Sequence, residues 1–390
     1  MKITAVETFT VDGGTHPWQF CAVRTDAGLT GYSEIGTEAI LHGIEGLVRD
    51  FGERLVGRDP GPIERIYTDL YRLMWQAPYG ATLVAIAGIE LALWDLKGKA
   101  LGVPVHALLG GPTRERQRVY WSHLASARVR HHALFGARPV RTVGDIADCA
   151  REAVAMGYTA LKTNIIMPED APAAAAAAAA RTDRVLTTAR LRQAERQIAA
   201  IRDAVGPDVD VCLDVGSSVA PPDALRLALA LEPYDLFWLE IDNQDPGALA
   251  ALRAATRIPI TSGETLQGPR QFLPFFQARA MDTAMIDIRY QGLAEARRVA
   301  ELAAVYDLKV APHNFNGHLC TFQSLHLTAA LANVRIMEYD VDAAPWRDDL
   351  FTHAPEVAGG EMLVPQRPGW GTDLREDVAR RHAWRGGAAG

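Results

Sequence analysis

Residues 209–264 contain three short apolar segments that each end in a carboxylate: VDVCLD (209–214), LFWLE (236–240) and IPITSGE (258–264). The segments are rich in β-branched and aromatic residues, and helical patterns separate them, which predicts buried parallel strands joined by helices. Their last residues, Asp214, Glu240 and Glu264, lie 26 and 24 residues apart, about one strand-helix unit each. Because a (β/α) barrel carries its chemistry at the C-terminal ends of its strands, we expect these carboxylates to lie together there.

Three carboxylates held close together repel one another and raise one another's pKa unless a cation lies among them. Oxygen ligands suit a hard divalent cation such as Mg²⁺. Each acid could instead cap the helix that follows its strand, but this explains one such residue better than three at equivalent positions. The pattern therefore favours a metal site made by Asp214, Glu240 and Glu264.

The alternation of strand and helix extends over residues 118–340 and predicts a (β/α) barrel domain. The predicted strands are 119–122, 159–163, 209–214, 237–240, 259–263, 283–288, 309–312 and 335–338. Residues 1–117 predict a separate α+β domain, with strands at 3–11, 21–25 and 29–34 and helices at 39–52, 62–75 and 83–100. Proline and glycine punctuate residues 341–390, a segment that we expect to fold back onto the first domain.

Residues 165–190 depart from this alternation, because an unbroken alanine run occupies residues 173–180. Alanine is the best intrinsic helix former, which favours a short helix. The run has no large side chain to bury, which favours a flexible flap equally well. It follows the second barrel strand, so either form could cover a substrate.

Composition sets limits on the class of protein. The chain has 390 residues, 48% hydrophobic and 22% charged, as is typical of a folded soluble protein. A net charge of −7 and a pI near 5.9 argue against a nucleic-acid or anionic-membrane partner. The N-terminus has no signal-peptide pattern, and the four cysteines are far apart, which favours buried, reduced thiols. Phosphate-binding glycine motifs and Gly-x-Ser-x-Gly are absent from the sequence. A cytoplasmic metabolic enzyme fits these features.

Further polar residues lie at the predicted strand ends. Lys162 and Asn164 share one face of the second strand; the lysine would pair with an anionic substrate or ligand, or reach solvent. Asp287 ends the sixth strand and His313 the seventh, so the pair could meet as a general acid/base whose imidazole tautomer the carboxylate fixes. Glu338 ends the eighth strand and could hydrogen-bond a substrate carboxylate if it is protonated.

The loop at residues 13–18 contains His16 and Trp18. It is either a mobile lid over the site or an ordinary surface loop.

The helix AGIELALWDLKGKALGVP (87–104), followed by LLGG (108–111), resembles the enolase superfamily, mandelate racemase subgroup. The resemblance covers nearly the whole chain. It implies a modified (β/α)₇β TIM-type barrel with an N-terminal α+β capping domain, and one Mg²⁺ per active site on Asp214, Glu240 and Glu264. It also implies abstraction of the proton α to a carboxylate, and more loosely a homo-oligomer.

The same resemblance implies roles for further residues. Asp287 and His313 match the acid/base dyad of the subgroup, and Glu338 matches its substrate-carboxylate residue. Loops around His16 and Trp18 would contribute specificity.

Differences from the subgroup's usual sequence reduce the number of reactions that fit this chain. Lys162-Thr163-Asn164 replaces the frequent Lys-x-Lys, so the second base that a racemase needs is missing. Lys-x-Asn resembles galactonate-dehydratase-like members, but those carry a histidine two residues after the strand 3 aspartate, where this chain has Gly216. His313 is thus the only obvious base.

These features predict an acid-sugar dehydratase of galactonate or galactarate type. His313 would take the α-proton and then protonate the departing β-hydroxyl, while Lys162 balances charge and Asn164 binds a substrate hydroxyl or carboxylate. A sugar-acid lactone cycloisomerase is the nearest alternative, and a racemase or epimerase follows. A metal- and ligand-binding barrel without turnover is the alternative of a different class.

Overall fold

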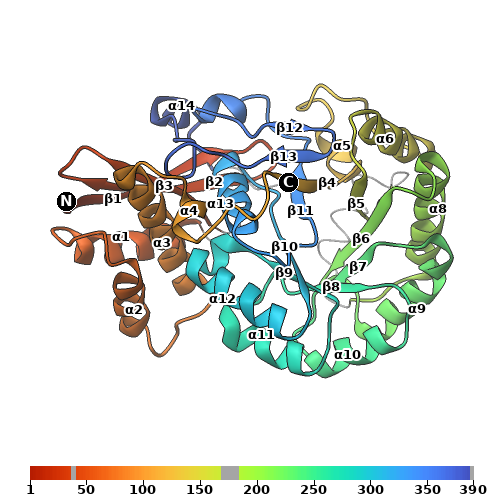
Figure 1. The fold of residues 1–390 in the computed structure, drawn as a ribbon. Helices are drawn as coiled ribbons and strands as arrows, with labels where there is room; N and C mark the ends of the chain where they lie inside the picture. Colours follow the sequence, from red (N-terminus) through yellow and green to blue (C-terminus); the bar gives the residue numbers. More distant parts are fainter. Residues whose placement is uncertain (37–40, 168–183, 387–390) are drawn as a thin grey trace.

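The computed structural model describes residues 1–36, 41–167 and 184–386, and places an α+β unit beside a barrel (Figure 1). In the α+β unit, β1 (Ile3–Asp12), β2 (Pro17–Thr25) and β3 (Thr30–Ile35) pair antiparallel in that order. Helices α1 (Leu41–Leu55), α2 (Ile63–Leu73) and α3 (Ala81–Leu101) pack with this sheet around one apolar core. The predicted loop at residues 13–18 is shorter than expected, because Pro17 and Trp18 already belong to β2.

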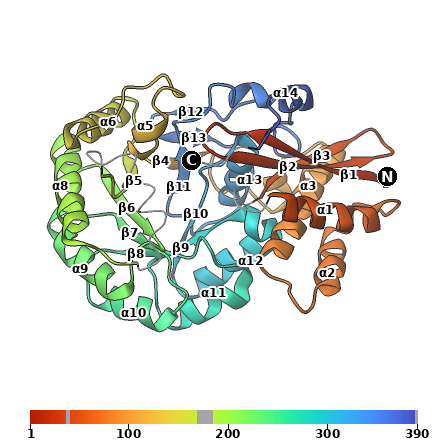
Figure 2. The same cartoon turned by 180° about the vertical axis from the view of Figure 1, so that it is seen from behind.

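The barrel follows the predicted order of strands, and helices surround it (Figure 2). Its strands are β4 (Arg116–Ser122), β5 (Ala160–Asn164), β6 (Asp210–Gly216), β7 (Trp238–Ile241), β8 (Ile260–Ser262), β9 (Thr283–Ile286), β10 (Lys309–Pro312) and β11 (Met337–Asp340). They pair parallel from β4 to β10, and β11 pairs with β4. Between β10 and β11, a parallel bridge joins Val310 to Val334. The fold class predicted from the sequence is confirmed.

Helices link the strands on the outside of the barrel. They are α5 (Ser126–His131), α6 (Val143–Ala155), α8 (Thr188–Val205), α9 (Pro221–Leu231), α10 (Pro246–Ala254), α11 (Gly268–Gln277), α12 (Gly292–Val305) and α13 (His318–Ala329). Short α4 (Val105–Leu108) precedes β4, and 3₁₀ turns follow α9 (η2, Glu232–Tyr234) and β9 (η3, Ile288–Tyr290).

A layer of buried side chains fills the inside of the barrel. Its members come from different strands: Tyr120, Ala160, Cys212, Trp238, Met285, Ala311 and Ile336. Because side chains of a strand alternate between its faces, the residue two positions further along each strand points the same way. These residues are Ser122, Lys162, Asp214, Glu240, Asp287, His313 and Glu338. The strand period therefore stacks one polar layer on the apolar one, at the C-terminal end of the barrel.

The C-terminal segment returns to the first domain, where Trp384 donates its backbone N–H to Thr10 and α14 (Glu376–Arg381) packs against β1. It also reaches the barrel, which was not predicted. Strand β13 (Glu361–Leu363) pairs antiparallel with β4 and with β12 (Val357–Ala358), and η4 (Asp348–Leu350) precedes both. The boundaries 1–117, 118–340 and 341–390 stay a prediction.

The helix or flap predicted for the alanine run at 173–180 lies outside the described residues. Among the described helices, none is long and apolar enough to cross a membrane. Cys21, Cys149, Cys212 and Cys320 are buried and unbridged, as predicted.

Candidate active site

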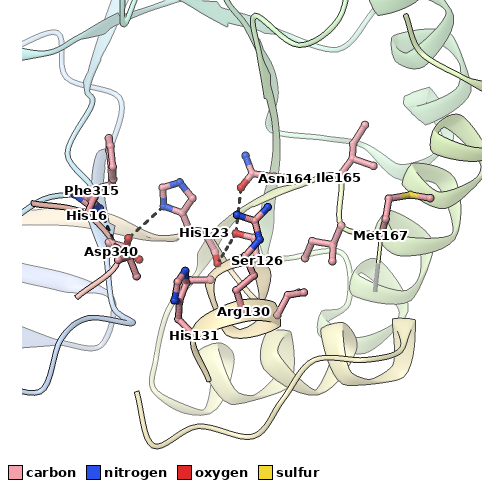
Figure 3. A pocket seen from close by; sticks show the side chains of 14 residues that line it. His16, His123, Ser126, Arg130, His131, Asn164, Ile165, Met167, Phe315 and Asp340 are labelled. Carbon is pink, nitrogen blue, oxygen red and sulfur yellow. Dashed lines mark hydrogen bonds and ion pairs between the residues drawn. The ribbon is translucent and has the colours of Figure 1, made fainter. Parts of the chain in front are cut away.

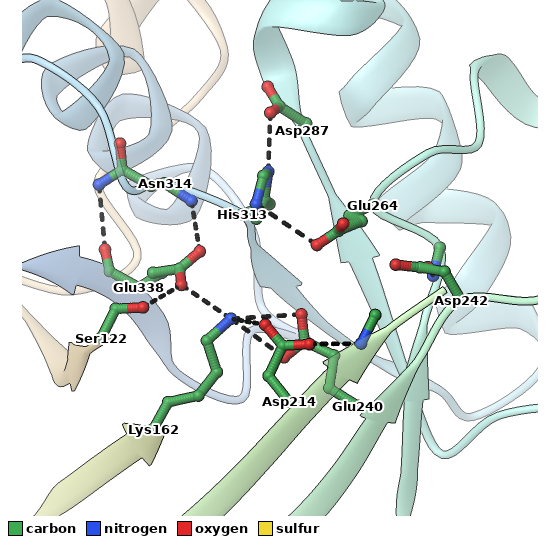
Figure 4. Close-up of polar contacts among 12 residues, drawn as sticks. Ser122, Lys162, Asp214, Glu240, Asp242, Glu264, Asp287, His313, Asn314 and Glu338 are labelled. Carbon is green, nitrogen blue, oxygen red and sulfur yellow. Dashed lines mark hydrogen bonds and ion pairs between the residues drawn. The ribbon is translucent and has the colours of Figure 1, made fainter. Parts of the chain in front are cut away.

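Lys162 lies buried among the carboxylates of the polar layer (Figure 4). Its Nζ lies 2.8 Å from Glu338 Oε1, 3.1 Å from Glu240 Oε2 and 3.6 Å from Asp214 Oδ2. Burial alone would lower the pKa of Lys162, but Glu240 and Glu338 raise it well above its usual range. The lysine is therefore a fixed positive charge in the barrel and does not reach solvent, the alternative that the sequence left open.

The carboxylates at the ends of β6, β7 and β8 carry more negative charge than Lys162 balances. Burial raises the pKa of Glu240, and Asp214 and Glu338 raise it further. Burial also raises the pKa of Glu264, together with repulsion from Asp242, Glu240 and Asp214. Asp242, two residues beyond Glu240, adds another buried carboxylate and accepts a hydrogen bond from the Gly263 backbone N–H.

This donor set fits a hard divalent cation in chemistry and in charge, because it consists of crowded oxygen ligands short of positive charge. As the side chains lie, however, no group of three or more His, Cys, Asp or Glu residues in the described chain is gathered closely enough to hold a metal ion. Asp214, Glu240 and Glu264 stay the predicted ligands of Mg²⁺.

His313 and Asp287 lie in contact at the ends of β10 and β9 (Figure 4). His313 Nδ1 lies 2.8 Å from Asp287 Oδ2, and His313 Nε2 lies 3.4 Å from Glu264 Oε2. Buried Arg289, which the sequence analysis missed, binds both Asp287 oxygens at 3.2 and 2.7 Å. Burial would raise the pKa of Asp287, but Arg289 and His313 hold it below its usual range. An ionised Asp287 accepts a hydrogen bond from Nδ1–H of His313, which leaves Nε2, on the side of Glu264, as the nitrogen without a proton.

Glu338 is buried and engaged on both of its oxygens. Oε1 accepts from Ser122 Oγ and Lys162 Nζ, and Oε2 accepts from the Asn314 backbone N–H at 2.7 Å. Burial would raise the pKa of Glu338, but Lys162, His313 and His123 lower it. The predicted hydrogen bond to a substrate carboxylate requires a proton that these neighbours disfavour, so Glu338 is better placed to hold Lys162.

Two cavities adjoin the polar layer and share Asn164 and Ile165. One of about 280 Å³ is lined by Asp214 and Glu264, and one of about 370 Å³ by His16, His123, Arg130 and Phe315 (Figure 3). Asn164 donates to the Asp214 carbonyl oxygen at 3.3 Å and accepts from Ser126 Oγ at 3.2 Å. Predicted substrate-binding residues Asn164 and His16 thus line cavities.

Trp18 is buried and does not line either cavity. Its indole N–H donates to His16 Nε2 at 3.2 Å, so Trp18 fixes the orientation of the His16 ring.

His123 and Asp340 form a second histidine-carboxylate pair that the sequence analysis missed. His123 Nδ1 lies 3.3 Å from Asp340 Oδ2 (Figure 3). The signal was present in the sequence, since His123 directly follows the predicted strand 119–122 and Asp340 lies two residues beyond Glu338.

Oxygen donors at successive strand ends, with a buried His–Asp pair facing them, define a barrel enzyme for proton chemistry on an anionic substrate. Residues 5–110 match the family of mandelate racemase / muconate lactonizing enzyme N-terminal domains, and residues 145–378 match the enolase C-terminal domain-like family. The chain belongs to the mandelate racemase/muconate lactonizing enzyme family of the enolase superfamily, whose members use Mg²⁺.

Curated relatives and solved structures agree with this family. The chain is 32% identical to a D-galactonate dehydratase of Variovorax paradoxus, over 97% of this chain and 93% of the relative. It is 31% identical to a D-xylonate dehydratase of Haloferax volcanii, over 98% and 89%. A Burkholderia xenovorans protein, for which an L-alanine-DL-glutamate epimerase activity has been suggested, was solved with magnesium and fumarate bound. It is 38% identical and covers 100% of this chain and 98% of its own, with a TM-score of 0.94.

Proposed function

We propose that the protein is a Mg²⁺-dependent lyase that removes the proton α to the carboxylate of a sugar acid and eliminates the β-hydroxyl. The observation that carries this proposal is the His313–Asp287 pair, whose Nε2 lies 3.4 Å from Glu264, one of the three predicted metal ligands. The relatives named D-galactonate and D-xylonate dehydratase support the same reaction and substrate class.

In this reaction His313 Nε2 takes the α-proton, and Asp287 stabilises the imidazolium that forms. Mg²⁺ on Asp214, Glu240 and Glu264 would bind the substrate carboxylate and offset the charge that develops on it. Lys162, which Glu338 and Glu240 hold in place, would add a fixed positive charge beside the substrate carboxylate. Asn164 offers its amide to a substrate hydroxyl at the border of the two cavities.

The placement of Lys162 argues against a racemase or epimerase. Such a reaction needs a second group that takes up and returns a proton on the other face of the substrate. Lys162 is engaged with Asp214, Glu240 and Glu338, and position 164, where the second lysine of Lys-x-Lys would stand, carries an asparagine. A lactone cycloisomerase uses the same proton abstraction and is separated from a dehydratase by its product.

The test is a panel of aldonic acids, aldaric acids and their lactones, incubated with Mg²⁺ in D₂O and followed by NMR. We expect a 2-keto-3-deoxy acid from the wild type and neither product nor α-deuterium from His313→Asn. His42→Asn, whose side chain is 99% exposed on α1, is the matched control and should behave as wild type.

Other outcomes separate the alternatives. Ring opening of a lactone without loss of water would assign a cycloisomerase, and inversion at the α-carbon without elimination would assign an epimerase. Magnesium binding without α-proton exchange on any acid of the panel would overturn the proposal in favour of a binding protein.

A further inference from the structure

His123 occupies a position at the mouth of the barrel that requires an unusual backbone. It directly follows β4 with φ +50°, in the left-handed region that costs a non-glycine residue local strain. Its carbonyl oxygen accepts from the Ser126 backbone N–H at 3.0 Å, and the next residue, Leu124, donates to the Lys162 carbonyl oxygen at 2.9 Å. These bonds hold the turn, which sets the His123 ring into the wall of the 370 Å³ cavity (Figure 3).

His123 and Asp340 repeat the construction of the His313–Asp287 pair on another part of the barrel. In both pairs, neighbouring parallel strands supply the two residues, here β4 and β11. Asp340 Oδ2 lies 3.3 Å from His123 Nδ1, which leaves Nε2 as the nitrogen to serve a ligand in the cavity. Burial would lower the pKa of His123, but Asp340 and Glu338 raise it above its usual range despite Lys162. The neighbouring carboxylates thus stabilise the protonated imidazole.

The two pairs flank the same aromatic ring. The Phe315 ring centroid lies 5.0 Å from that of His313 and 5.4 Å from that of His123. His123 lines the larger cavity, and His313 Nε2 lies 3.4 Å from Glu264, which lines the smaller one; the two cavities share Asn164. Lys162 cannot take the place of the second histidine, because its ammonium is held by Asp214, Glu240 and Glu338.

We propose that His123 is the general acid that protonates the departing β-hydroxyl, with Asp340 as its positioning residue. This inference rests on the proposed dehydratase function and replaces the single-histidine reaction expected from the sequence. His313 takes the α-proton, and the electron pair of the C–H bond enters the enediolate. That pair then forms the Cα–Cβ double bond while the Cβ–O bond breaks, and the leaving oxygen takes the Nε2 proton of His123 and departs as water.

The enol product becomes the 2-keto acid when Cβ receives the proton held by His313. The enol O–H proton passes to water, and His123 regains one proton from water. One water molecule is released for each turnover, and both histidines return to their starting states.

The test separates exchange from elimination on one substrate. In D₂O with Mg²⁺, His123→Asn should exchange the α-proton within about threefold of the wild-type rate while dehydration falls by about 10²–10⁴-fold, the usual contribution of a general acid. His313→Asn should lose both. Retained exchange shows that the variant is folded.

A second variant removes the ring and allows it to be replaced. His123→Gly suits the positive φ, and added imidazole should restore dehydration by at least tenfold without changing exchange. Three results would overturn the assignment of His123. The first is dehydration at the wild-type rate in His123→Asn, and the second is a parallel loss of exchange and dehydration in a variant with the wild-type circular dichroism spectrum. The third is the absence of rescue by imidazole. Absence of exchange and product in the wild type would instead overturn the proposed function, and this inference with it.

Discussion

Replacing Lys162 by methionine tests the charge balance of the polar layer. The change keeps much of the side-chain volume and removes the cation from Glu338, Glu240 and Asp214, at 2.8, 3.1 and 3.6 Å. At an effective dielectric constant of about 20, each attraction at these distances amounts to roughly 5 kcal/mol. Desolvation of the buried ions offsets most of this, so we expect the free energy of unfolding to fall by about 3–5 kcal/mol, as for other broken buried pairs.

Magnesium should reduce this loss, because a divalent cation among the carboxylates supplies the charge that the variant lacks. The assay is urea unfolding followed by tryptophan fluorescence, in EDTA and in saturating Mg²⁺. Trp238 is a suitable reporter, since its indole N–H donates to Glu240 Oε2 at 3.2 Å. We expect Mg²⁺ to raise the midpoint of Lys162→Met more than that of the wild type.

Lys309→Met is the matched control, because Lys309 is exposed at the first position of β10. Its midpoint should stay within the equivalent of about 0.5 kcal/mol of the wild type. If Lys162→Met in EDTA matched this control, or if Mg²⁺ stabilised both variants equally, the reasoning about charge balance would be refuted.

Three further changes probe the dyad, the interdomain contact and the cavity. Asp287→Asn should lower kcat by about 10²–10⁴-fold in steady-state assays, because the amide no longer fixes the tautomer of His313; a loss below tenfold would contradict the assigned orientation. Burial raises the pKa of Glu34 from its usual 4.5 to about 7, so its stabilising effect is full below about pH 4.5 and is lost as the pH rises through 7. Between pH 5 and 8, the free energy of unfolding of the wild type, measured with urea, should fall by about 2–3 kcal/mol relative to that of Glu34→Gln. Parallel pH profiles of the two proteins would show that Glu34 does not have this effect. Arg130 lines the 370 Å³ cavity and is exposed, so it could pair with a second, distal carboxylate of a substrate. Arg130→Gln should raise KM about two- to fivefold for acids with such a carboxylate and leave KM for other acids unchanged. Equal effects on both kinds of acid would rule out this ion pair.

The sequence predicted the layer of the site that depends on the strand period. Asp214 and Glu240 follow buried Cys212 and Trp238 by two residues on their strands, so alternation alone brings their carboxylates to one end of the barrel. The same logic places His313 beside Asp287 on neighbouring strands. Local sequence carries this information, because each position needs only the strand and its direction.

Contacts between distant segments had no such local signal. Arg289 binds Asp287 because a 3₁₀ turn follows β9, and no pattern in the sequence predicts that turn. Glu34 accepts hydrogen bonds from the backbone N–H groups of Gly317 and Cys320, which are 283 and 286 residues away. The sequence around Glu34 does not predict either partner. His123 is a different case, since the end of the first strand was predicted and the residue that follows it was overlooked.

The segment His313-Asn314-Phe315-Asn316-Gly317 connects the first domain, or cap, to the polar layer of the barrel. His313 is the proposed base, the Asn314 backbone N–H donates to Glu338, and the Phe315 ring contacts both His313 and His123. Asn316 contacts His16 of the cap, and Gly317 donates to Glu34.

A Cβ at position 317 would lie 2.7 Å from Glu34 Oε2, so a larger residue there would displace the Glu34 carboxylate from the N-terminus of α13. Burial raises the pKa of Glu34 to about 7 and outweighs the N–H groups of Gly317 and Cys320 at that helix terminus, which lower it. Glu34 and His16 thus contact Gly317 and Asn316, four and three residues after His313 in the chain. The first domain and the proposed base of the barrel therefore meet within one segment of five residues.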